Sequence, residues 1–123
     1  MIGYVTVGTN DFESSLAFYD ALFASIDIQR LWKHGNMAAW GTTRDQPSFC
    51  ISSPFDGKAA TAGNGTMIAL RMAEQAQVNT IHAKALELGG SCEGAPGPRG
   101  DHGFYGGYFR DPEGNKLNAY IAG

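Results

Sequence analysis

Residues 4–23, YVTVGTNDFESSLAFYDALF, predict a short strand that leads directly into a helix. Val5 and Val7 point to one side of the predicted strand and their neighbours to the other, which is the period of a strand with one apolar face. Large apolar residues then recur at helical spacing, at Phe12, Leu16, Tyr19 and Phe23. Asn10, with Glu13 three residues later, predicts a capping box at the start of the helix. The stretch therefore predicts a strand-helix unit.

Three further strands are predicted after this helix. Residues 26–41, IDIQRLWKHGNMAAWG, indicate two strands around a turn at 34–36. Residues 47–53, PSFCISS, indicate a fourth strand, with Phe49 and Ile51 on one face. The first half of the chain is therefore expected to be a β-α-β-β-β module.

The second half of the chain repeats this order of elements. A strand, a helix, at most a short strand and then two strands are expected at 65–72, 73–90, 91–95, 104–110 and 115–121. The predicted helix ends at Gly89-Gly90, where a glycine commonly terminates a helix. Asp111-Pro112-Glu113-Gly114 is a tight-turn sequence that joins the last two strands. A unit of this size that occurs twice suggests a duplication.

The segment between the halves, PFDGKAATAGNG, is rich in turn residues and has no periodicity. We therefore expect a single domain over residues 1–123. It would contain a first module at 1–55, a linker at 54–64 and a second module at 65–123.

Each predicted module has one helix, which covers only one face of its sheet. Two such modules side by side are expected to form a half-open barrel with a shared cleft, in the fold class α+β. Strand alternation places one set of side chains under the helices: Val5, Val7, Ile68, Leu70, Met72, Leu117, Ala119 and Ile121. It places the other set in the cleft: Tyr4, Thr6, Cys50, Met67, Arg71, Asn118 and Tyr120.

The composition excludes several function classes. The net charge is −3 and the nine lysines and arginines are scattered without a run, so no nucleic-acid partner is expected. The two cysteines, Cys50 and Cys92, form no C-x-x-C pair, and a reduced chain is the simpler interpretation, although one disulfide stays open. No segment reads as a signal peptide or a membrane span, so we expect a cytoplasmic protein with no membrane partner.

Four stretches carry a resemblance to a known family: residues 4–23, 63–70 (GNGTMIAL), 89–109 (GGSCEGAPGPRGDHGFYGGYF) and 110–120 (RDPEGNKLNAY). In this order and at this separation the chain resembles the vicinal oxygen chelate superfamily, which includes glyoxalase I, bleomycin-resistance proteins and extradiol dioxygenases. The resemblance implies the paired βαβββ fold and a homodimer.

The resemblance also implies where a metal would bind. Metal-dependent members of the family hold a divalent ion with His or Glu from the first, fourth, fifth and eighth strands. The matching positions here are Tyr4, a position near Cys50, Met67 and Asn118. Hard divalent ions prefer carboxylate oxygen or imidazole nitrogen, and a phenol, a thioether and an amide are poor substitutes. We therefore expect no metal and no cofactor.

A protein of this fold without a metal is expected to bind a small organic molecule in its cleft. The candidate binding residues are Tyr4, Thr6, Cys50, Met67, Arg71, Arg99, His102, Tyr108, Asn118 and Tyr120. Arg71 would bind a carboxylate through its guanidinium, and the loop-like stretch 95–108 is the expected lid. His102, beside Asp101, is a candidate general base. His34 and His82 are expected at the surface.

Two alternatives stay open. If a divalent ion is held by other groups, the chain would be a metal-dependent lyase, similar to lactoylglutathione lyase, or a dioxygenase. The candidate ligands are then His34, Glu93, His102 and Glu113. It would have only a structural or partner-binding role if the cleft is filled. Neither the ligand nor a catalysed reaction follows from the sequence.

Overall fold

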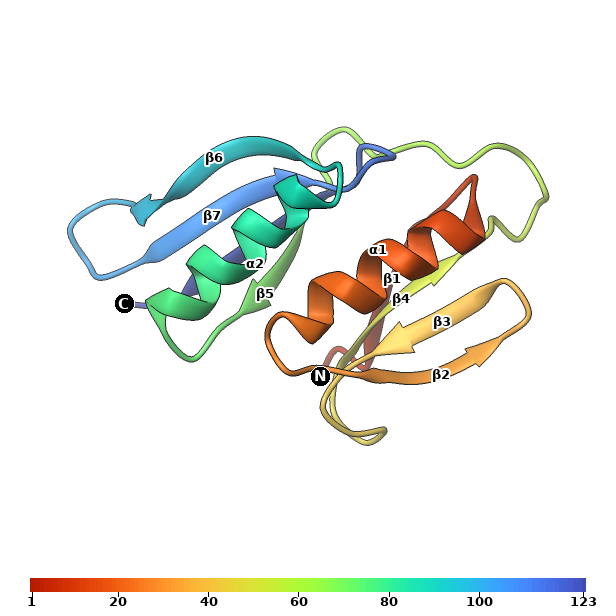
Figure 1. Cartoon of the computed structure of the whole chain (residues 1–123), viewed down its shortest axis with the longest axis horizontal. Helices are drawn as coiled ribbons and strands as arrows, with labels where there is room; N and C mark the ends of the chain where they lie inside the picture. The colour runs from red at the N-terminus through yellow and green to blue at the C-terminus, as the bar shows by residue number, and fades with distance from the viewer. The chain divides into compact units, whose positions relative to one another are not determined.

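The computed structural model describes all 123 residues and divides into two compact units, unit one (Met1–Ala62) and unit two (Gly63–Gly123). Each unit contains one helix and one four-stranded sheet (Figure 1). Unit one has β1 (Tyr4–Gly8), α1 (Phe12–Ala24), β2 (Arg30–His34), β3 (Met37–Trp40) and β4 (Ser48–Ser52). Unit two has β5 (Ile68–Arg71), α2 (Gln75–Glu87), β6 (Ser91–Pro98), β7 (Tyr105–Arg110) and β8 (Lys116–Ile121). The predicted α+β class with two βαβββ modules is confirmed.

The two sheets have the same topology. Unit one has the strand order β1-β4-β3-β2, and unit two has the order β5-β8-β7-β6. In each unit the first and last strands pair in parallel and the other pairs are antiparallel. The helix follows the first strand and covers one face of its own sheet (Figure 1). The opposite face of each sheet, which we call the helix-free face, has no helix of its own unit against it.

An aromatic cluster forms the core of unit one. The ring of Tyr19 on α1 lies 4.8 Å from that of Phe49 on β4 and 5.7 Å from that of Trp40 on β3. Phe23, one turn further along α1, stacks on Trp40 at 5.8 Å. Trp40 is only 1% exposed, and its indole Nε1 donates a hydrogen bond of 2.9 Å to Asp20. This cluster holds α1 on the sheet through large buried rings, which supply much of the apolar area.

Unit two has a core of smaller side chains. Val78, Ile81 and Ala85 on α2 are fully buried, as are Phe109 and Leu117 on the sheet. These positions are one helical stripe and one strand face, as the periodicity predicts.

His82 is part of this core, so its predicted place at the surface is wrong. It is 5% exposed, its Nε2 lies 3.2 Å from the carbonyl oxygen of Tyr108, and its ring meets Phe109 edge-on. Gly107 makes room for it, because a Cβ there would lie 3.2 Å from Cδ2 of His82 and 3.1 Å from Cγ of Pro96. A glycine on strand β7 thus gives this histidine close packing room, which helical periodicity alone does not reveal.

The predicted capping box at Asn10 and Glu13 is also wrong. The N-cap of α1 is Asp11, whose carboxylate accepts hydrogen bonds from the backbone N–H of Ser14 at 3.1 Å and from its hydroxyl at 2.8 Å. These bonds lower the pKa of Asp11. Asn10 instead binds the backbone of Ala60. Its amide is used to hold the linker and not to start the helix.

The stretch expected to be at most a short strand is the eight-residue strand β6, Ser91–Pro98. It lies at the edge of the sheet and pairs only with β7, with register shifts around Gly94. Edge strands and bulges are the places where a sheet tolerates proline and glycine. Within the stretch 95–108, residues 95–98 and 105–108 are therefore strands of a hairpin, and its turn is 99–104. Met67 likewise lies just before β5 and not in it.

The turn between β7 and β8 is closed by Asp111, which is 4% exposed. Its Oδ1 accepts hydrogen bonds from the backbone N–H groups of Glu113 and Asn115 at 3.0 and 2.9 Å. Gly114 adopts a φ of 97°, which favours glycine. This turn sets the register of β8 against β7, and hence which side chains of β8 lie beside Tyr108.

His82 makes the stability of the fold depend on pH. Burial lowers the pKa of His82 below its ordinary value of 6.5, and the hydrogen bond to Tyr108 offsets this only in part. Below pH 6.5 the imidazole of His82 binds a proton in the unfolded chain but stays neutral in the folded chain. The free energy of unfolding therefore falls as the pH drops from 6.5 towards the folded-state pKa. Denaturant titrations at several pH values between 7 and 5 should show this loss, and His82→Gln should flatten it. His102→Gln, an exposed control, should keep the wild-type slope; an unchanged slope in His82→Gln would contradict the assignment.

Candidate functional site

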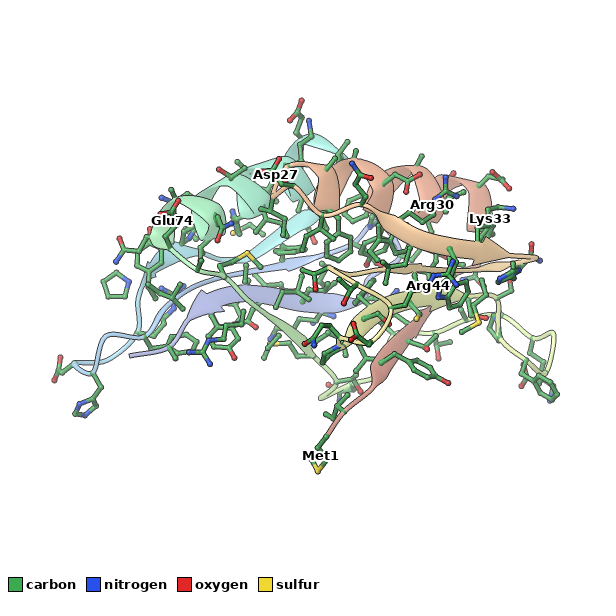
Figure 2. All side chains as sticks on the ribbon, turned by 90° about the horizontal axis from the view of Figure 1, so that it is seen from below. Met1, Asp27, Arg30, Lys33, Arg44 and Glu74 are labelled. Atoms are coloured by element: carbon green, nitrogen blue, oxygen red, sulfur yellow. The ribbon has the colours of Figure 1, made fainter.

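The helix-free face of unit one carries polar and aromatic side chains. Phe49 contacts Tyr19 on α1, so its neighbour Cys50 points to the opposite face. Thr6 pairs with Cys50 and shares that face, as does Tyr4 two residues before it. Figure 2 shows Arg30 and Lys33 on the helix side of this sheet, and Met1 extending from its other side. The alternation predicted for Tyr4, Thr6 and Cys50 is therefore present.

A groove of about 600 Å³ lies on this face. Its lining includes Tyr4, Trp32, Met37, Arg44 and Cys50. Three of these, Trp32, Met37 and Arg44, are absent from the predicted binding residues. Strand alternation could have found Trp32, since it pairs with Ala39, which pairs with Cys50. Arg44 lies in the loop after β3, where no periodicity applies.

A second groove of about 440 Å³ lies beside the first. Met37 lines both grooves, and Thr6, Phe55 and Ala60 line the second. One wall of the second groove is thus the linker itself. The amide of Asn10 holds this wall in place, because its Nδ2 donates to the carbonyl of Ala60 at 3.0 Å and its Oδ1 accepts from the N–H of Ala60 at 2.7 Å. Two bonds to one residue leave the linker little freedom there.

Cys50 has the environment of a buried thiol and not that of a nucleophile. It is 1% exposed, and burial raises its pKa, with a hydrogen bond to Ser48 offsetting the rise in part. The thiol is therefore protonated at neutral pH, whereas a nucleophile or a metal ligand must be a thiolate. Both cysteines of the chain are free.

The helix-free face of unit two carries a buried amide among aromatic rings and cations. Asn118, in the middle of β8, pairs with Ala69 on β5 and Tyr108 on β7, so these three side chains share a face. Asn118 is 2% exposed, and its Oδ1 has no hydrogen-bond partner. Arg71 pairs with Tyr120, two residues beyond Asn118, and lies exposed on the same face.

Aromatic rings and cations pack closely around this amide. The guanidinium of Arg99 lies 5.4 Å from the ring centre of Tyr108, and Nζ of Lys116 lies 5.9 Å from it. Phe104 stacks on Tyr120 with ring centres 5.4 Å apart. This stacking depends on Gly106, because a Cβ there would lie 2.9 Å from the Phe104 ring.

Arg99 is fixed to the hairpin and does not extend from it. Its guanidinium donates hydrogen bonds to the carbonyl groups of Ala95, Gly97 and Pro98 at 2.7, 2.9 and 3.3 Å. A Cβ at Gly94 would lie 3.3 Å from Nη2 of Arg99, so glycine gives the side chain room to fold back. The positive charge is thereby held over Tyr108.

The remaining predicted residues lie apart from these groups. Met67 is 40% exposed before β5, and His102 is exposed in the turn of the β6–β7 hairpin. Glu93, a candidate ligand in the alternative hypothesis, forms an ion pair with Arg110 that lowers its pKa. No three or more His, Cys, Asp or Glu side chains are grouped so that they could hold a metal ion.

Residues 1–119 match the model of the Glyoxalase/Bleomycin resistance protein/Dioxygenase superfamily. The chain belongs to this superfamily. It is 34% identical to a glyoxalase/bleomycin resistance protein from Albidiferax ferrireducens T118, with 100% of this chain and 99% of that chain covered and a TM-score of 0.89. The predicted resemblance is confirmed.

More distant members of the superfamily share the fold. The structure of lactoylglutathione lyase from Agrobacterium tumefaciens is 19% identical, with a TM-score of 0.70 over 98% of this chain and 92% of that one. A glyoxalase/bleomycin resistance protein/dioxygenase family enzyme from Burkholderia phytofirmans PsJN is 17% identical, with a TM-score of 0.75 over 98% and 97% of the two chains. No curated protein sequence matches the chain significantly. Neither helix has the length and apolar character to span a membrane.

The contact between Asn10 and the linker yields a test of how the second groove is held. Asn10→Ala should lower the free energy of unfolding by roughly 1–2 kcal/mol, since two hydrogen bonds are lost, and should speed proteolysis within residues 53–62. Denaturation is followed by tryptophan fluorescence, because both tryptophans, Trp32 and Trp40, lie in unit one. Asn64→Ala, on an exposed turn of the same linker, is the control. Equal cleavage rates in the two variants would show that Asn10 does not hold the linker.

Proposed function

We propose that this superfamily member binds a small organic molecule on the helix-free face of a sheet and uses no metal ion. The observation that carries the proposal is the groove on unit one, in which apolar and aromatic side chains such as Trp32 and Met37 lie beside polar and charged ones such as Arg44 and Asp45. Its volume of about 600 Å³ lies in the range of ligand sites in proteins, and its polar groups could orient a bound molecule.

The chemistry of the side chains argues against a metal. The positions that the resemblance matches to the metal ligands of the superfamily are Tyr4, a position near Cys50, Met67 and Asn118. The thiol of Cys50 is held protonated by burial, and the other three offer a phenol, a thioether and an amide. A hard divalent ion gains little from such donors. The charged groups of the alternative hypothesis do not gather into a set of three.

Binding without a metal is compatible with sequestration of the ligand, and we propose this as the simplest role. The proposed ligand-binding residues are those of the helix-free faces: Tyr4, Thr6, Trp32, Met37, Cys50, Arg71, Tyr108, Asn118 and Tyr120. Cys50 would contribute an apolar surface and Arg71 a charge. A homodimer and a cytoplasmic location stay predictions.

The absence of a metal requirement can be measured directly. Protein purified without added metal should contain substoichiometric Mg, Mn, Fe, Ni and Zn by elemental analysis. After treatment with EDTA, its melting temperature should change little when any one of these divalent ions is restored, because a ligand raises the melting temperature only by binding the folded state. A stoichiometric metal, or a large stabilisation by a single ion, would contradict the proposal.

Ligand binding in the groove of unit one has an internal reporter in Trp32. A thermal-shift screen of small organic molecules should yield binders, and a compound at tenfold its Kd should add about 1.4 kcal/mol to the stability, a shift of several degrees. Binders in this groove should change the tryptophan fluorescence. Trp32→Phe should remove most of that change while the thermal shift persists. A screen without any stabilising organic compound would refute the proposed function.

A further inference from the structure

The amide of Asn118 is the least satisfied polar group in the chain. It is 2% exposed, and Oδ1 is the only buried side-chain nitrogen or oxygen atom without a hydrogen-bond partner. Nearly all buried polar groups in proteins are paired, because leaving one unpaired forfeits the hydrogen bonds it makes with water. Oδ1 of Asn118 could therefore be paired by a hydrogen-bond donor from outside the chain.

The neighbours of Asn118 on the same strand face are positively charged or aromatic. Arg71 forms no ion pair, and neither does Lys116, two residues before Asn118. Glu93 forms an ion pair with Arg110 and also interacts electrostatically with Lys116. Arg71 thus has no intramolecular counter-charge, and the face favours a negatively charged ligand at this residue.

The spacing of these groups indicates the size of the ligand. Arg71 lies one diagonal step from Asn118, since it is two residues beyond Ala69, the partner of Asn118 on the neighbouring strand. Diagonal neighbours in a sheet are roughly 7–8 Å apart. That span suits one ring with a substituent at each end, and the stacked pair of Phe104 and Tyr120 offers a flat surface beside it.

We propose that the helix-free face of unit two binds a small organic anion that also carries a hydroxyl or N–H donor. The carboxylate of the ligand pairs with the guanidinium of Arg71, and its donor group binds Oδ1 of Asn118. The inference rests on the proposed function and adds the chemical class of the ligand to it.

Three related probes separate the two contacts without any mutation. 4-Hydroxybenzoate has the anion and the donor, 4-methoxybenzoate keeps the anion and lacks the donor, and 4-hydroxybenzyl alcohol keeps the donor and lacks the anion. Titration of the full chain by calorimetry should give the lowest Kd for 4-hydroxybenzoate. The Kd of 4-methoxybenzoate and the Kd of 4-hydroxybenzyl alcohol should each be roughly tenfold higher, because the first leaves a buried acceptor without a partner and the second leaves a cation without one.

Variants then assign each preference to its residue. Asn118→Leu, a swap of similar size, should make the hydroxyl and methoxy probes bind alike. Arg71→Gln should remove the preference for the carboxylate and keep the preference for the hydroxyl. Lys58→Gln removes one positive charge from the exposed linker and should retain both preferences. Melting curves establish that each variant is folded, and Asn118→Ala, which also lacks the acceptor, replaces Asn118→Leu if the leucine variant is not.

The outcomes distinguish this inference from the function on which it rests. Equal affinity of the wild-type chain for the hydroxyl and methoxy probes, or a hydroxyl preference that survives in Asn118→Leu, would overturn the role of Asn118. If none of the three probes binds while other organic molecules stabilise the fold, the inferred ligand class is wrong and the proposed function stands. If no organic molecule binds at all, both fail.

Discussion

A four-stranded sheet has two faces, and each unit of this chain has only one helix with which to cover them. The helix side of each sheet is a dense apolar core, built from rings in unit one and from smaller side chains around Phe109 in unit two. The other side is left for polar and aromatic groups, because alternation sends every second residue there. The candidate site therefore follows from having one helix for each four-stranded sheet. The residues proposed for function lie on the helix-free face or next to it.

The faces of the strands could be predicted from the sequence because alternation is a local property. Thr6, Cys50 and Asn118 could be assigned to one side from their immediate neighbours, and the repeat of strand and helix patterns was enough for the two βαβββ modules. What failed depends on contacts between distant segments. The close packing of His82 depends on a glycine on β7, and the role of Asn10 requires Ala60, fifty residues away. The length of β6 requires the pairing partner β7, which outweighs the low strand propensity of its glycines and prolines.

The glycines show how such distant contacts shape the candidate site. Gly94 and Gly97 give the guanidinium of Arg99 space to bind three carbonyl groups of its own hairpin, and Gly106 lets Phe104 lie against Tyr120. None of these glycines has a positive φ, so the backbone does not demand them. They are required for space, and the high glycine content reflects close packing of side chains on strands as well as turns. Motif matching cannot detect this requirement, because the side chain that fills the space comes from elsewhere.

Charge explains why an amide and not a carboxylate suits position 118 in the proposed site. A carboxylate there would attract Arg71 and neutralise the cation that an anionic ligand needs, whereas an amide leaves the charge of Arg71 without a counter-charge. An uncharged amide oxygen also gives little to a hard divalent ion, which prefers carboxylate oxygen. In the proposed site the amide at position 118 therefore leaves Arg71 available for an anion, and its unpaired oxygen adds a requirement for a hydrogen-bond donor.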